Sequence, residues 1–259
     1  MIDPHSLAGI AVMVLLGLIG GVVSILVGGS SLIVFPSLMA LGFGPVGAVA
    51  TYAVAMFPAG LVGTFADRAA RPLADRRLAW QLGLAAAGGV AGSWLLVRTP
   101  LSALNWLVPL LIGAATLLFA YANTVQRALA RRYRGADLQD SWGLRVALAL
   151  SYLYGGYFGT GLGIIVMGLQ AASGSDNFRR ANAVKNLAIT MCAAASLFVF
   201  IADGYVDWLG AAAIALGGVF GAYAGGRLAM RLRGETFRGI VVGVGVVMTV
   251  VYAARYLLT

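Results

Sequence analysis

The sequence predicts an all-α polytopic membrane protein. Of its 259 residues, 61% are hydrophobic and only 10% are charged, whereas a soluble domain carries roughly 25% charged residues. The apolar residues form continuous runs, most of them near the roughly 20 residues that a helix needs to cross a bilayer. Because these runs do not alternate between apolar and polar residues, they argue against a transmembrane β-barrel.

Ten apolar runs follow one another along the chain. They span residues 7–27, 32–41, 45–65, 78–97, 103–122, 144–158, 164–172, 178–201, 206–226 and 239–258. The first is interpreted as a retained helix rather than a signal peptide, because the residues before it include Asp3 and no Lys or Arg. The runs 32–41 and 164–172 are too short to span a membrane as helices.

Each short run directly follows a cluster of glycine and hydroxyl residues, at 28–31 and at 159–163. A shift of about 132 residues lays the first cluster and its short run on the second. We therefore expect two repeats, each with a broken or re-entrant Gly-rich helix plus three full transmembrane helices. The first repeat covers residues 1–122, the basic polar linker 123–143, and the second repeat 144–259.

The arginines favour one topology over another. Seventeen of the 18 basic residues are arginine, clustered between the apolar runs. If the chain turns back at each Gly-rich break, 15 of the 17 arginines lie on one face, which fits the positive-inside rule. If each broken element crosses instead, the last cluster lies opposite the others. The first arrangement predicts inverted repeats with both termini outside.

The charged residues also limit the chemistry. All nine acidic residues fall in predicted loops, ends or tails, which argues against a cation site and against carboxylate-mediated proton coupling. Lys185, the single lysine, lies about two turns into the run 178–201, with Asn182 on the same helical face and Asn186 beside it. A buried cation next to amides suits an anion. The alternative is a lysine that snorkels to the headgroups.

The Gly-rich breaks supply the other candidate ligands. A short helix that starts inside the membrane offers free backbone N–H groups and a positive dipole end, and glycine allows close approach. The alternative is close helix packing through small residues. Thr51 and Tyr52 take the repeat positions of Lys185 and Asn186 and are candidates to line the same cavity. The candidates at the breaks are Gly29, Ser30, Ser31, Thr160, Gly161 and Gly163.

The remaining titratable residues indicate no further chemistry. Cys192 lies in an apolar run and is interpreted as a buried hydrophobe, so no disulfide framework is expected. His5 is expected to be a solvated tail residue. We expect no metal and no cofactor. Nucleic acid is not an expected partner either, because there is no soluble basic domain.

Three segments resemble motifs of one transporter family. Residues 29–36 (GSSLIVFP) and 155–163 (GGYFGTGLG) resemble the two Gly-rich motifs of the sulfite exporter TauE/SafE family, although the first has fewer glycines than is usual there. Residues 180–187 (RANAVKNL) are similar to its R-A-N-A-x-K-N-L stretch, the most specific of the three. The resemblance covers essentially the whole chain.

This resemblance implies a secondary transporter of small sulfur-containing anions, such as sulfite or a sulfonate, in the inner membrane. Lys185 would neutralise the anion, and alternating access would rock the two repeats around it. An anion channel with the same lining, or a membrane accessory or assembly protein without transport, stays open as an alternative. An enzyme is not expected, since no nucleophile–base or metal-ligand arrangement is visible. The direction of transport, the coupling ion and the oligomeric state are not determined.

Overall fold

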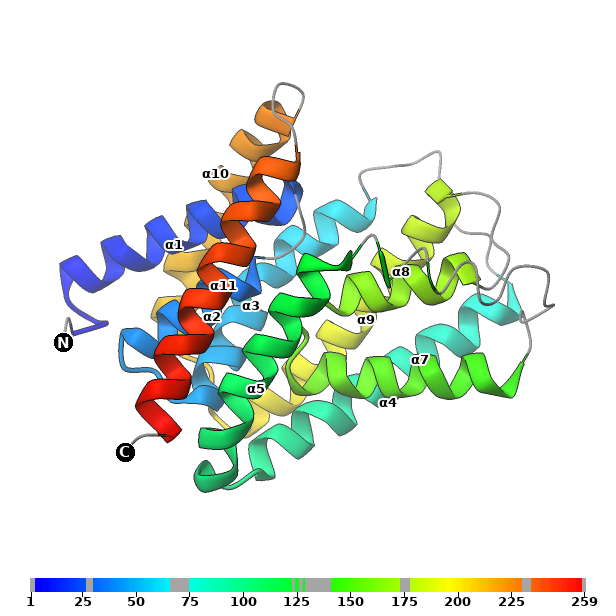
Figure 1. Ribbon diagram of the computed structural model, residues 1–259, viewed down its shortest axis with the longest axis horizontal. Coiled ribbons are helices and arrows are strands. Elements are labelled where there is room, and N and C mark those ends of the chain that lie inside the picture. The colour runs from blue at the N-terminus through cyan, green and yellow to red at the C-terminus, as the bar shows by residue number, and fades with distance from the viewer. Residues whose placement is uncertain are drawn as a thin grey trace. The chain divides into compact units, whose positions relative to one another are not determined.

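The computed structural model of the chain is built of α-helices (Figure 1). It describes residues 3–26, 30–65, 75–122, 124, 125, 128, 141–172, 178–229 and 234–257, and within these residues there is no strand. The predicted all-α fold is confirmed. The helices are α1 (Leu7–Leu26), α2 (Ser31–Ala40), α3 (Pro45–Phe65), α4 (Arg76–Arg98), α5 (Leu101–Ala120), α7 (Trp142–Tyr157), α8 (Leu162–Ala172), α9 (Phe178–Ala202), α10 (Trp208–Ala229) and α11 (Gly234–Leu257).

The helix bounds follow the apolar runs closely, and two of the differences have a local cause. A carboxylate oxygen of Asp75 accepts the backbone N–H of Leu78 at 2.7 Å, so α4 begins before its apolar run. The Ser141 hydroxyl accepts the N–H of Leu144 at 3.2 Å and caps α7 in the same way. Such caps satisfy N–H groups of the first turn, which lets polar residues enter a helix ahead of its apolar part.

Several helices meet the length and composition of membrane spans. Among the described residues, four apolar stretches of at least 18 residues qualify: Leu7–Ser24, Arg76–Arg98, Leu101–Ala120 and Ala181–Ala202. Shorter apolar stretches occur in α2, α3, α10 and α11. Large apolar side chains on these helices are exposed, including Leu110 at 67% and Phe198 at 76%. Exposed apolar surface on this scale fits helices that face lipid.

The chain forms two compact units, and each combines helices from both halves of the sequence. The first contains α1, α2, most of α3, α5, α10 and α11, and the second contains α7, α8 and most of α4 and α9. These units are defined by packing, whereas the predicted boundaries at 122 and 144 concern an internal repeat. Those boundaries stay a prediction.

In the first unit, α1 packs along α10 through glycines. A Cβ atom on Gly217 would clash with the Val14 carbonyl, and one on Gly21 would clash with the Gly218 carbonyl. Residue numbers rise together along the two helices, so α1 and α10 run parallel. Close approach of helix backbones through small residues is characteristic of membrane proteins, where apolar burial gives little drive for helix association.

Two other contacts of the first unit involve α11 and α2. Gly113 of α5 lies against Thr249 of α11, and Thr116 lies against Gly245, so these two helices run antiparallel. The side chain of Val34 in α2 lies against Gly20 of α1. The Tyr252 hydroxyl of α11 donates a 2.7 Å hydrogen bond to the carbonyl of Pro36 and thereby ties α11 to α2.

The second unit uses the same packing device. A Cβ atom on Gly156 of α7 would clash with the carbonyls of Gly88 and Gly89 in α4, so α4 and α7 approach closely. The Ser196 hydroxyl of α9 donates to the carbonyl of Gly89 at 3.1 Å. An apolar core from all four helices fills the unit; its buried members are Ala85, Leu144, Leu148, Tyr152, Leu162, Val166, Leu169, Ala188 and Cys192.

Candidate anion-binding site

The first break separates α1 from α2. Ser30, the residue before α2, is buried, and its hydroxyl lies 2.8 Å from the Tyr52 hydroxyl of α3. This hydroxyl does not cap α2, whose Ser30 carbonyl instead accepts the N–H groups of Ile33 and Val34. The Tyr52 hydroxyl also interacts with the Ser31 side chain. The structure therefore brings together three predicted site residues, while Gly29 lies outside the described residues.

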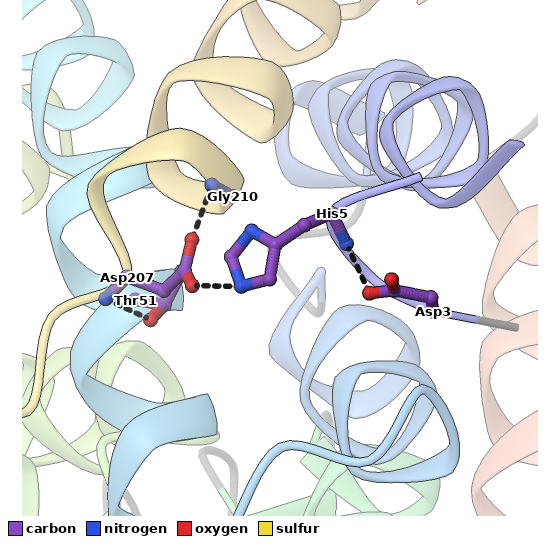
Figure 2. A network of polar contacts seen from close by, with 5 residues as sticks. All are labelled: Asp3, His5, Thr51, Asp207 and Gly210. Atoms are coloured by element: carbon purple, nitrogen blue, oxygen red, sulfur yellow. Dashed lines mark hydrogen bonds and ion pairs between the residues drawn. The ribbon is translucent and has the colours of Figure 1, made fainter. Parts of the chain in front are cut away.

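Thr51 neighbours Tyr52 in the chain but has a different partner. Its side chain is fully buried, and its Oγ1 accepts the backbone N–H of Asp207 at 3.1 Å. The Asp207 carboxylate accepts the N–H of Gly210 at 2.6 Å and lies 3.2 Å from Nε2 of His5 (Figure 2). This network joins the segment before α1, the first turns of α3 and the start of α10. The hydroxyl of Thr51 thus has a structural partner, and its place in a substrate cavity stays a prediction.

The second break lies between α7 and α8 and depends on two glycines. Gly159 and Gly161 have φ angles of +73° and +80°, a region that residues with a Cβ atom rarely adopt. Thr160 between them is buried, and its carbonyl accepts a 2.7 Å hydrogen bond from the Tyr154 hydroxyl. The chain therefore turns sharply here, and α8 begins immediately afterwards at Leu162.

Lys185 lies about two turns into α9, as the sequence predicts. Lys185, Asn182 and Asn186 are all half-buried. Ile189, one turn beyond Lys185 on the same helical face, points at Gly163: its Cδ1 lies 3.7 Å from where a Cβ on that glycine would sit. The lysine-bearing side of α9 therefore faces the start of α8 inside the second unit.

The electrostatics of this face are simple. In the part of the chain that the structure describes, one ion pair is present, between His5 and Asp207. Lys185 therefore has no carboxylate partner among those residues. A cation inside an apolar helix is costly unless something compensates its charge, and here the nearest polar side chains of α9 are neutral amides. An anion is the ligand that compensates a lone ammonium.

The predicted site residues fall into two sets. Ser30, Ser31, Thr51 and Tyr52 belong to the first unit, and Thr160, Gly161, Gly163, Asn182, Lys185 and Asn186 belong to the second. Within the first, Ser30, Ser31 and Tyr52 come together; within the second, Gly163 contacts the helix that carries Lys185.

Sequence reasoning missed two polar arrangements. His5 is solvent-exposed, at 55%, as the sequence predicts, but its Nε2 also lies 3.2 Å from the carboxylate of Asp207, a contact that the sequence did not indicate. Gln81 of α4 and Gln170 of α8 form a buried hydrogen bond in the second unit. An amide inside an otherwise apolar run was the available signal for both glutamines, whereas nothing local in the sequence links His5 to Asp207.

A chain of many apolar helices has Gly-rich breaks before two short ones and a lysine in a span that lacks a carboxylate partner among the described residues. These are features of a multi-pass helical membrane transporter. The chain belongs to the sulfite exporter TauE/SafE family, whose family model matches residues 13–252. The expected family and the multi-pass location in the inner membrane are thereby confirmed.

The chain is also similar to curated proteins of that kind. It is 24% identical over 261 residues to the probable membrane transporter protein YfcA of Escherichia coli strain K12, a match that covers 96% of this chain and 90% of the relative. The YfcA proteins of the O6:H1 and O157:H7 strains match equally well. No solved structure matches the chain.

Proposed function

We propose that this membrane transporter carries small sulfur-containing anions, such as sulfite, a sulfonate or a related oxyanion, and that it is not an enzyme. The observation that carries the proposal is Lys185, a half-buried cation in a membrane-spanning helix without a carboxylate partner among the described residues. A small anion compensates this charge, and the neighbouring amides of Asn182 and Asn186 supply hydrogen-bond donors.

The two breaks supply further donors in this proposal. Short helices begin at Ser31 and Leu162, and their first N–H groups have no partner within the helix. The contact of Gly163 with Ile189 supports a site in which the start of α8 and the Lys185 face of α9 share one ligand. Ser30 and Tyr52 form the corresponding polar pair of the other repeat.

Alternating access requires two structurally related halves, and the helix contacts support such a relation. Gly21 of α1 lies against Gly218 of α10, and Gly156 of α7 lies against Gly89 of α4. In both cases the first helix of one half pairs with the fourth helix of the other through glycines. The antiparallel α5 and α11 agree with inverted repeats, because corresponding helices then point in opposite directions.

Transport by the purified protein in liposomes tests the proposal. We expect saturable uptake of labelled sulfite or of a sulfonate such as sulfoacetate, and competition between them. Lys185→Ala removes the charge and is expected to lower kcat/KM for transport about tenfold or more, as for a lost charge-assisted hydrogen bond. Lys185→Arg keeps the charge and is expected to retain part of the activity.

The control is Thr190→Ala on the same helix, which leaves every charge in place. A saturable flux that is unchanged in Lys185→Ala contradicts the proposed binding site but not the proposal that the protein is a carrier. A flux that does not saturate identifies a channel. Absence of any sulfur-anion flux, from protein that is folded by thermal melting, contradicts the substrate class.

A further inference from the structure

A buried polar cluster lies in the second unit and is formed by residues outside the predicted site set. The Gln170 amide nitrogen of α8 donates a 3.1 Å hydrogen bond to the Gln81 amide oxygen of α4. The two side chains are only 5% and 1% exposed. Gln170 lies near the end of α8 and Gln81 near the start of α4, so the pair is formed where these two ends meet.

This cluster contains hydrogen-bond donors that lack acceptors. Among the residues that the structure describes, the buried Nε2 of Gln81 has no hydrogen-bond partner. The same is true of Nη2 of Arg77, which lies one turn earlier on the same face of α4. Native proteins rarely leave buried donors unsatisfied, and each exception asks for an explanation, of which a bound water or ion is one.

A second guanidinium reaches the same turn of α4. The central carbon of the Arg145 guanidinium in α7 lies 5.3 Å from the centroid of the Trp80 ring. Trp80 directly precedes Gln81 in the sequence. The guanidinium of Arg77, the amide nitrogen of Gln81 and the Arg145 guanidinium against Trp80 thus lie at the same end of α4, and all three groups are donors.

We propose that Arg77, Gln81 and Arg145 form a second anion-binding site, which takes a tetrahedral oxyanion of the phosphate or sulfate type. Such a group offers only acceptor atoms, and a guanidinium matches its geometry through two parallel N–H donors. The first turns of α4 form one end of a membrane-spanning stretch. An oxyanion at such an end comes either from an anionic lipid headgroup or from solution. The site does not depend on the proposed transport function.

Two measurements on the full-length protein in non-ionic detergent test the site and separate the sources. The first is the shift of the melting temperature with inorganic sulfate and phosphate, compared with chloride at equal ionic strength. The second is native mass spectrometry with phosphatidylglycerol, compared with phosphatidylcholine. We expect binding in at least one of the two. A lipid headgroup is the source if only phosphatidylglycerol binds, and a free oxyanion if only the salts act.

The variants decide whether the binding belongs to this cluster. Gln81→Glu keeps the acceptor for Gln170 but replaces the free donor by a charge that repels an anion. Arg77→Gln removes one guanidinium. Each is expected to weaken binding about tenfold or more. Arg76→Gln, the same charge change at an exposed neighbour, is the matched control and is expected to bind as the unmodified protein does.

Three results overturn the inference. They are no binding in either measurement, equal losses in Arg76→Gln and Arg77→Gln, and a loss in Lys185→Ala without one in Arg77→Gln. The last result assigns the anion to the transport site. If Gln81→Glu fails to fold, Arg77→Gln alone decides, because its side chain is half-buried and tolerates a polar replacement. A failure to observe sulfite transport would contradict the proposed function but not the inference of this second site.

Discussion

Tyrosine hydroxyls fix both Gly-rich breaks, although they come from different elements. At the first break, Tyr52 of α3 bonds the side chain of Ser30. At the second, Tyr154 of α7 bonds the backbone carbonyl of Thr160. Both contacts are at least half-buried, where a hydrogen bond is costly to leave unmade. Single residues therefore set the local geometry on which a ligand site at the breaks depends.

The pair of Ser30 and Tyr52 gives a prediction at this scale. Tyr52→Phe and Ser30→Ala each remove one partner and are expected to destabilise the protein by about 0.5–1.5 kcal/mol. The double variant is expected to lose less than the sum, since one hydrogen bond is shared. Melting temperatures of the four proteins check this. Strict additivity would show that the two hydroxyls do not interact energetically.

Glycines set the helix pairs. Gly17, Gly21, Gly217 and Gly221 allow α1 and α10 to touch along their backbones, and Gly88, Gly92 and Gly156 do the same for α4 and α7. Other glycines of the same helices have no such role. Gly83 of α4 has open space where a Cβ atom would be. Packing thus separates glycines that the sequence alone presents as equivalent.

This difference predicts opposite effects of the same substitution. Gly217→Ala places a methyl group against the Val14 backbone and is expected to cost about 1–3 kcal/mol, the range for overpacking. Gly83→Ala is expected to be neutral or to stabilise by up to about 1 kcal/mol, because alanine is the better helix former. Thermal melting in detergent compares the two. Equal destabilisation by both would contradict the α1–α10 contact.

For the whole molecule, the network around Asp207 constrains the path of the chain. It joins the segment before α1, the first turns of α3 and the start of α10, all within the first unit. These three helices therefore begin at the same end of that unit. A chain that returns to its starting side between α1 and α3 places the three helix starts at one end. The positions of the arginine clusters favour the same path under the positive-inside rule.

The orientation of the protein is testable directly. We expect both termini outside, so that a C-terminal alkaline phosphatase fusion is active and a C-terminal green fluorescent protein fusion is dark. Fusions after residue 130, in the basic linker, are expected to give the reverse pattern. Fluorescence from the C-terminal fusion would exclude the turning-back topology. The linker fusion is the internal control, because its arginines are predicted to stay inside.

The sequence by itself determined the membrane class, the helix bounds to within a few residues, the family and the unusual position of Lys185. These properties depend on local composition and on charge, since a long apolar run has few alternatives to a helix in a bilayer. The observed starts of α4 and α7 differ from the predicted ones because Asp75 and Ser141 cap these helices. Both caps are polar residues outside the apolar runs.

Only the tertiary structure decided which segments meet. Nothing in the 36 glycines says which ones touch another backbone, because that depends on a partner far along the chain. The same holds for the bond between Gln81 and Gln170 and for the partner of Thr51, which lies 156 residues away. Small residues and buried amides acquire their roles from non-local contacts, and a linear pattern does not specify those contacts.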